Sequence, residues 1–248
     1  MGLLAQFLLR LSFGLAVGMA ITSSQKVTSG FFRNHLYVTL GLTTLAAIVL
    51  SRIAPVEMWI AIAAAAGSYV GSAAWLYEAN RFGKVMIVLV AICSIAAAIL
   101  LPSTASAAQL PLWSAVSVAT SGLVLGLVFA SMLLGHWYLN APGMEIVPLQ
   151  RLIAASAVAV VVEAIVAGIG LVAVVSTQPS VTVAWLLFTL LRWSFGLFGV
   201  LALLWMARRT LEIPNTQSAT GILYVAVLGT FIGELTGLLL SAESAYPL

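Results

Sequence analysis

Long apolar stretches, separated by short polar segments, run the whole length of the chain. A helix needs about 20 apolar residues to cross the hydrocarbon core of a bilayer. The pattern therefore predicts an all-α fold, a polytopic membrane helix bundle of about eight transmembrane helices within a single integral-membrane domain, residues 1–248. The predicted spans are residues 3–22, 36–50, 57–77, 85–101, 112–134, 152–175, 183–206 and 221–240.

The composition supports the same class. Hydrophobic residues make up 62% of the chain and charged residues only 7%, whereas a soluble domain carries about 25% charged residues. The net charge of +3 is spread over the connections without a dense basic patch, which argues against a nucleic-acid partner. Lipid is the expected surrounding, and the lone Cys93 is expected to be an inert thiol inside an apolar run.

Eight spans determine which connections share a face of the membrane. The connections after the first, third, fifth and seventh spans share one face, and the opposite face holds only Arg52 outside a span. Because basic residues concentrate on the cytoplasmic side, we expect this face to be cytoplasmic, with both termini outside and the protein in the plasma (inner) membrane. The basic residues of the first face are Lys26, Arg33, Arg81, Lys84, Arg151, Arg208 and Arg209.

Two kinds of repetition appear in the spans. Leu-Arg-Leu-Ser-Phe-Gly at 9–14 returns as Leu-Arg-Trp-Ser-Phe-Gly at 191–196, and Leu-Tyr-Val occurs at 36–38 and 223–225. These echoes suggest a bundle built from repeated helical hairpins. Glycines also recur four residues apart, at 14 and 18, 67 and 71, 122 and 126, and 229, 233 and 237. Such spacing favours close helix packing in lipid.

Four charged residues stand alone inside apolar runs: Arg10, Glu163, Arg192 and Glu234. A single arginine at membrane depth costs at least ~2.5 kcal/mol, so we expect the two arginines and two glutamates to neutralise one another. At 1.5 Å per residue, Arg10, Arg192 and Glu234 lie about 10–13 Å below the outer face, and Glu163 lies about 18 Å below it.

This predicted intramembrane charge centre has two interpretations. Intramembrane ionisable groups often mark a site for an ion, a proton or an anionic substrate, and Glu163, the deepest of the four, is then the expected proton carrier. Alternatively, the four charges form an ion-pair network that only fixes the register of the helices.

A second candidate site lies at the basic end. His35 opens the second span, with Arg33 and Tyr37 beside it. His136 closes the fifth span, and Trp137 and Tyr138 follow it within a predicted polar connection, residues 135–151. Two histidines at one level can ligate haem b, and a histidine–aromatic pocket can hold a quinone. An ordinary interfacial belt of aromatic residues is the alternative. The sequence therefore leaves open whether this site binds haem b, binds a quinone or holds no cofactor.

Common enzyme motifs, including His-Glu-x-x-His, Gly-x-Ser-x-Gly and a phosphate-binding loop, are absent. We therefore assign no catalytic or metal-ligating residue and expect no catalysis by the chain alone. Three hypotheses remain. The first is a membrane subunit of a quinone- or haem-handling electron-transfer complex, with other redox subunits as partners. The second is a small secondary transporter or channel, and the third is an assembly or scaffold protein.

Overall fold

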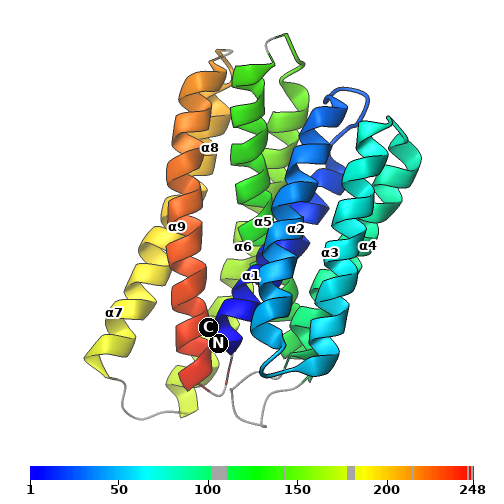
Figure 1. The fold of residues 1–248 in the computed structure, drawn as a ribbon. Helices are drawn as coiled ribbons and strands as arrows, with labels where there is room; N and C mark the ends of the chain where they lie inside the picture. The colour runs from blue at the N-terminus through cyan, green and yellow to red at the C-terminus, as the bar shows by residue number, and fades with distance from the viewer. Residues whose placement is uncertain (102–110, 142, 178–181, 214, 245, 247) are drawn as a thin grey trace.

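The computed structural model describes residues 1–101, 111–141, 143–177, 182–213, 215–244, 246 and 248. Long helices run up and down between two ends, and the two termini lie close together at one of them (Figure 1). We call this the terminal end. The opposite end carries the connections around residues 22–28, 77–79, 143–146 and 211–213, and we call it the basic end because most of the basic residues lie there.

The first half of the chain forms one four-helix bundle. Each helix packs on the next along the chain, and the fourth returns to pack on the first. Stacking of Phe32 on Trp75, with ring centroids 4.2 Å apart, fills its interior near the basic end. The helices are α1 (Gly2–Ile21), α2 (Ser29–Leu50), α3 (Pro55–Leu76) and α4 (Asn80–Leu100).

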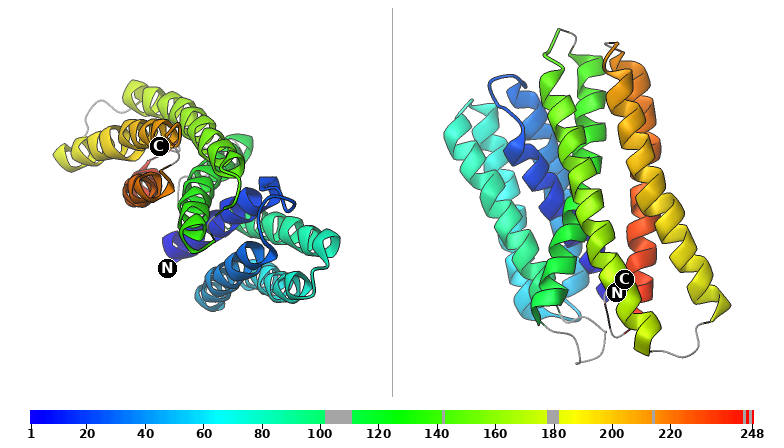
Figure 2. Two further views of the ribbon diagram at one scale, coloured as in Figure 1. Left: turned by 90° about the horizontal axis from the view of Figure 1, so that it is seen from above. Right: turned by 180° about the vertical axis from the view of Figure 1, so that it is seen from behind.

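The second half repeats this closed arrangement. Its elements are α5 (Pro111–Asn140), α6 (Val147–Thr177), α7 (Val183–Leu191), η1 (Arg192–Gly199), α8 (Val200–Thr210) and α9 (Thr216–Glu243). Helix α5 packs on α6, α6 on α8, α8 on α9, and α9 on α5. Viewed along the helices, the two bundles lie side by side (Figure 2).

Contact between α1 and α5 joins the two bundles. The helices cross where glycines remove the side chains: a Cβ added to Gly14 would lie 1.9 Å from the Gly122 carbonyl oxygen, and one added to Gly126 would lie 1.9 Å from the Gly14 carbonyl carbon. Backbones this close require glycine on both helices. The crossing therefore places α1 of the first bundle directly against α5 of the second.

The all-helical membrane bundle predicted from the sequence is confirmed. Within the described residues, seven helical segments are long and apolar enough to span a membrane. Helix α2 falls outside that set, but it runs beside them for 22 residues. Three of its polar side chains, His35, Thr39 and Thr43, are buried, and Thr39 Oγ1 lies 3.0 Å from Ser68 Oγ on α3.

Two local features differ from the sequence-based expectation. Residues 135–151 were expected to form a connection, but helix α5 continues to Asn140 and α6 begins at Val147. Aromatic residues such as Trp137 and Tyr138 suit an interfacial helix end as well as a loop, which explains the error. The seventh predicted span is also not uniform, because its middle, Arg192–Gly199, is π-helical.

Candidate functional site

Arg192 lies at the centre of the second bundle. Its Nη2 is 2.6 Å from Glu163 Oε1 on α6 and 4.0 Å from Glu234 Oε1 on α9. Its Nη1 also donates to the Gly233 carbonyl oxygen at 3.4 Å. All three charged residues are no more than 3% exposed. One guanidinium is thus shared between two carboxylates, and it lies much closer to Glu163 than to Glu234.

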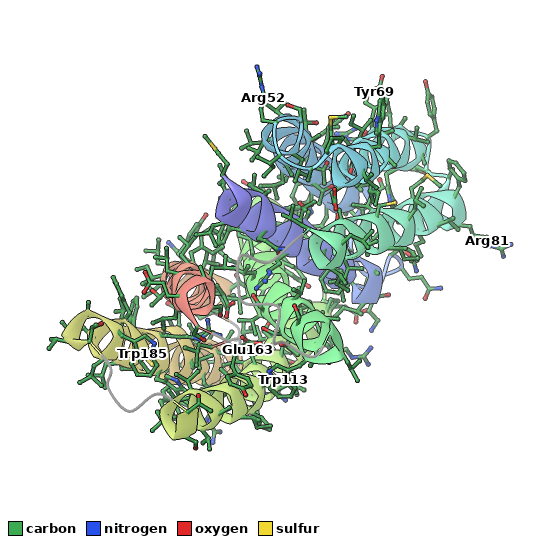
Figure 3. All side chains as sticks on the ribbon, turned by 90° about the horizontal axis from the view of Figure 1, so that it is seen from below. Arg52, Tyr69, Arg81, Trp113, Glu163 and Trp185 are labelled. Carbon is green, nitrogen blue, oxygen red and sulfur yellow. The ribbon has the colours of Figure 1, made fainter. Side chains whose placement is uncertain are left out.

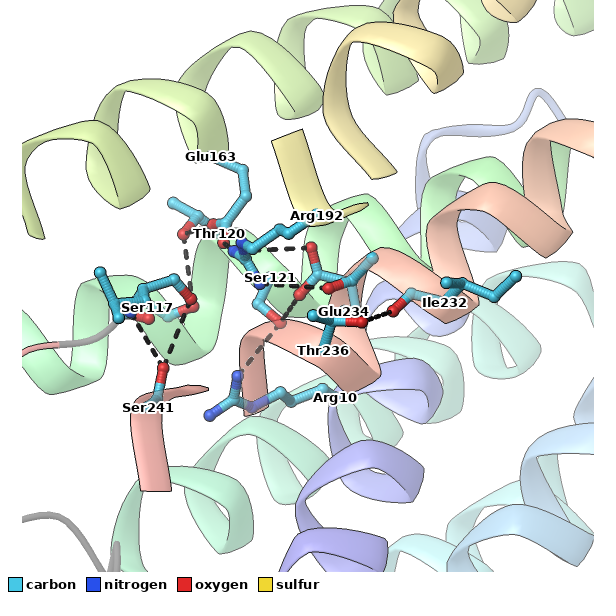
Figure 4. Close-up of polar contacts among 12 residues, drawn as sticks. Arg10, Ser117, Thr120, Ser121, Glu163, Arg192, Ile232, Glu234, Thr236 and Ser241 are labelled. Carbon is cyan, nitrogen blue, oxygen red and sulfur yellow. Dashed lines mark hydrogen bonds and ion pairs between the residues drawn. The ribbon is translucent and has the colours of Figure 1, made fainter. Parts of the chain in front are cut away.

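Helix α5 supplies a hydroxyl to each carboxylate. The Thr120 hydroxyl donates to Glu163 Oε2, and the Ser121 hydroxyl donates to Glu234 Oε2 at 2.5 Å. Hydrogen bonds from neutral donors stabilise a buried carboxylate. Helix α5 therefore stabilises both acids, although Glu234 lies farther from Arg192 than Glu163 does. Figure 4 shows the two residues on one turn of α5 facing the two glutamates.

Arg10 reaches the same cluster from the first bundle. Its Nη1 donates to Ser121 Oγ at 3.1 Å, and its Nε donates to Gln6 Oε1 at 3.1 Å. Gln6 in turn donates to the Ala98 carbonyl oxygen of α4 at 2.9 Å. Ser121 therefore joins Arg10 to Glu234 without direct contact between the two charges (Figure 4). We refer to Arg10, Glu163, Arg192 and Glu234 as the charge centre.

Glycines make room for the charge centre. A Cβ on Gly196 would lie 2.5 Å from the Cα of Gly233, so the π-helical segment and α9 touch through their backbones. A Cβ on Gly237 would lie 1.3 Å from Arg192 Nη1. The guanidinium thus occupies the space that any larger residue at position 237 would fill.

The π-helical segment begins at Arg192 itself. A π-helical turn widens the helix locally and is often found at functional sites. Here the arginine is its first residue, and both Arg192 and Gly196 contact Gly233 of α9. The second copy of the repeated hexad therefore has a different backbone from the first copy, residues 9–14, which lies wholly in the α-helix α1.

The charges of the centre add to zero when all four residues are ionised. Buried charges are tolerated only when they are paired and hydrogen-bonded, and this condition is met for Glu163 and Arg192 by the contacts above. Arg10 differs in that its side chain is partly exposed. The described contacts thus connect a partly exposed cation to the buried acid Glu234 through the neutral hydroxyl of Ser121.

The histidines lie in separate environments at the basic end. His35 is 5% exposed, its Nδ1 contacts the Phe31 carbonyl oxygen at 2.5 Å, and its ring lies 4.2 Å from that of Phe31. His136 is exposed, and its Nδ1 lies 3.2 Å from the Tyr224 hydroxyl. Trp137 lies on the His35 side, with the two ring centroids 6.3 Å apart, and its Nε1 donates to the Thr28 hydroxyl at 3.0 Å.

The remaining residues of the predicted histidine site are scattered. Tyr138 donates from its hydroxyl to the Glu145 carbonyl oxygen and closes the connection between α5 and α6. Tyr37 is 48% exposed, and Arg33 lies half-buried near the start of α2. The structure thus brings His35 and Trp137 together, whereas His136 and Tyr138 have partners of their own and Tyr37 is exposed.

Sequence reasoning missed the neutral members of the site: Gln6, Thr120 and Ser121. A signal was present for Gln6, because a polar residue four positions before Arg10 lies on the same helix face. Thr120 and Ser121 form a polar pair directly before Gly122 in an apolar run. Hydroxyls in a membrane helix usually bond to their own backbone, so nothing in the sequence marks these two as ligands of a carboxylate.

The described part of the chain holds no group of three or more histidine, cysteine, aspartate or glutamate side chains that would bind a metal ion. Comparisons of the chain with protein-family models, with curated proteins and with solved structures found no match.

Proposed function

We propose that the protein is a secondary transporter that moves a proton together with a small solute through the charge centre. The observation that supports this most directly is the bridge through Ser121, whose hydroxyl contacts both Arg10 and Glu234. It links a partly exposed cation of the first bundle to a buried acid of the second. Transporters commonly place their site near the membrane midplane, between two halves that can move against each other.

The distances favour Glu234 over Glu163 as the proton carrier. Glu163 lies 2.6 Å from Arg192, whereas Glu234 lies 4.0 Å from it. A carboxylate in direct contact with a guanidinium resists protonation more than one farther away, because the opposite charge stabilises its ionised form. Arg10, Arg192 and Glu163 are the charged groups that surround Glu234, and neutralising Glu234 leaves the other three with a net positive charge.

The proposal includes an orientation in the plasma membrane. Most of the basic residues outside the helix interiors lie at the basic end, and Arg52 lies at the terminal end. The positive-inside bias then makes the basic end cytoplasmic and leaves both termini outside. In this orientation the charge centre is closer to the outer surface, and Arg10 faces the outer half of the membrane.

A membrane subunit for electron transfer is the second candidate, supported by the contact of buried His35 with Trp137. The geometry favours it less, because His35 and His136 each have a separate hydrogen-bond partner. An absorption spectrum of the purified protein separates the two candidates. A Soret band that His35→Ala or His136→Ala removes would support electron transfer and would count against transport.

The main test uses purified protein in liposomes that enclose a pH-sensitive dye. We expect an imposed pH gradient to drive proton entry in the presence of a transported solute, and we expect Glu234→Gln to reduce this rate at least tenfold. Glu212→Gln is the matched control, because Glu212 is exposed and pairs with Arg209 at the surface. Equal rates in the two variants would contradict the proposal.

A further inference from the structure

Three polar side chains form a row on one face of the seventh membrane segment. Trp185, Thr189 and Arg192 follow one another at spacings of four and three residues, which places them on the same side of a helix. The row leads from the terminal end into the charge centre, over about 10 Å. Figure 3 shows Trp185 and Glu163 in the second bundle, seen from the terminal end.

Each residue of the row has a buried polar atom without a hydrogen-bond partner among the described residues. These atoms are Trp185 Nε1, Thr189 Oγ1 and Arg192 Nε. Thr189 is 8% exposed and Arg192 is 3% exposed. A buried donor or acceptor without a partner costs about 1–3 kcal/mol, so three in sequence on one helix face call for a specific explanation.

Thr189 departs from the usual behaviour of hydroxyls in this protein. Most buried threonines in other helices donate to the carbonyl oxygen three or four residues earlier, as Thr43 does to Thr39 at 2.7 Å and Thr230 does to Ala226 at 2.9 Å. Thr189 also lies inside a helix, but its hydroxyl makes no such bond. Its hydrogen-bonding capacity is therefore available to a ligand.

The chemistry of the row suits an acceptor. The indole Nε1 and the guanidinium Nε can only donate, and the threonine hydroxyl can donate as well as accept. Around Trp185 the packing is apolar and includes Val174, Leu240 and Leu248. A row of donors with apolar walls and a cation at its inner end matches a small anion better than a cation.

We propose that this row is the binding path of a small monovalent anion, such as chloride, nitrate or a short carboxylate, which travels with the proton carried by Glu234. This inference rests on the proposed function. Arg10, Arg192, Glu163 and Glu234 sum to zero, so an anion alone would leave an uncompensated negative charge in lipid, which is costly. Protonation of Glu234 from water on the side of uptake restores neutrality, and one proton and one anion then leave together on the other side.

The test measures proton entry into liposomes under inward gradients of chloride, nitrate or acetate, with gluconate as the reference anion. We expect at least one of the three to accelerate entry fivefold or more in the unaltered protein. Thr189→Val should remove most of this acceleration, and Thr189→Ser, which keeps the hydroxyl, should retain it. Thr43→Val is the matched control, because it also removes a buried threonine hydroxyl but in the first bundle.

The outcomes separate this inference from the proposed function. Proton entry that depends on Glu234 but not on the anion, or that Thr189→Val slows equally in every anion, would show that the row holds water, and the anion path would be wrong. Loss of anion acceleration in Thr189→Val with Thr43→Val unaffected would support it. Absence of any proton entry that Glu234→Gln reduces would overturn both.

Discussion

Arg192 and Glu163 form an ion pair of 2.6 Å between two helices, and both side chains are only 3% exposed. Such a pair contributes little net stability, but removing one partner leaves the other charged and buried, which costs about 3–5 kcal/mol. The pair therefore constrains which substitutions the second bundle tolerates. Because the cost appears in the stability of the protein, the pairing can be tested without measuring transport.

The first prediction concerns coupling within this pair. Arg192→Leu and Glu163→Leu alone should each lower the free energy of unfolding in detergent by about 3 kcal/mol or more. The double variant should lose clearly less free energy of unfolding than the two single variants lose together, because neither charge of the pair is then left without the other. The exposed Arg209–Glu212 pair, with side chains 59% and 58% exposed, should show a coupling below about 1 kcal/mol. Additive effects at Arg192 and Glu163 would contradict the pairing.

The second prediction concerns the space beside Arg192. Gly237→Ala places a methyl group where Arg192 Nη1 now lies, so the guanidinium must move away. Because the end of a long side chain can shift more easily than backbone, we expect the variant to fold and to lose at least fivefold in proton entry. Gly221→Ala on the same helix meets nothing within 4 Å and should retain the full rate. Equal rates in both variants would argue against a role for the position of Arg192.

A third prediction tests the crossing of α1 and α5. Gly126→Ala brings a Cβ to 1.9 Å from the backbone of Gly14, and neither backbone can yield without separating the bundles. We expect destabilisation of at least about 3 kcal/mol, at the upper end of what overpacking costs, seen as a lowered melting temperature in detergent. Gly41→Ala has nothing within 4 Å and should be neutral or slightly stabilising. A normal melting temperature for Gly126→Ala would refute the close crossing.

The fourth prediction concerns orientation. In a Cys93→Ala background, Lys26→Cys introduces a thiol at the basic end and Ile53→Cys introduces one at the terminal end; both positions are exposed. In intact cells, a membrane-impermeant maleimide should label the Ile53→Cys protein only. After disruption of the membrane both should react. The reverse pattern in intact cells would invert the proposed topology.

The helices and the isolated charges could be predicted from the sequence, because the lipid surroundings restrict which residues a membrane helix contains. Lipid requires long apolar runs, and it makes an isolated arginine such as Arg10 stand out against its neighbours. The glycine spacing at 14, 122 and 126 likewise pointed to close packing, and the crossing of α1 and α5 uses those residues. What each charge contacts was not readable, because that depends on how the helices rotate and pack.

The sequence did not predict the features that depend on neutral side chains or on the backbone conformation. Ser121 connects Arg10 and Glu234, yet serine in a membrane helix normally bonds to its own backbone. The π-helical segment that begins at Arg192 carries nearly the same hexad as the ordinary α-helix α1, so the hexad alone does not predict it. The neutral row at Trp185 and Thr189 gives no periodic signal beyond that of an apolar helix.

The bridge from Arg10 to Ser121 also has a consequence for biosynthesis. The two residues are 111 positions apart, so the first helix enters the bilayer long before α5 has been made. During that interval, Gln6 on the same helix is the only described partner of the guanidinium that is already synthesised. Because an unpaired arginine is costly in lipid, we expect the nascent first helix to reach full depth only once the second half has been made.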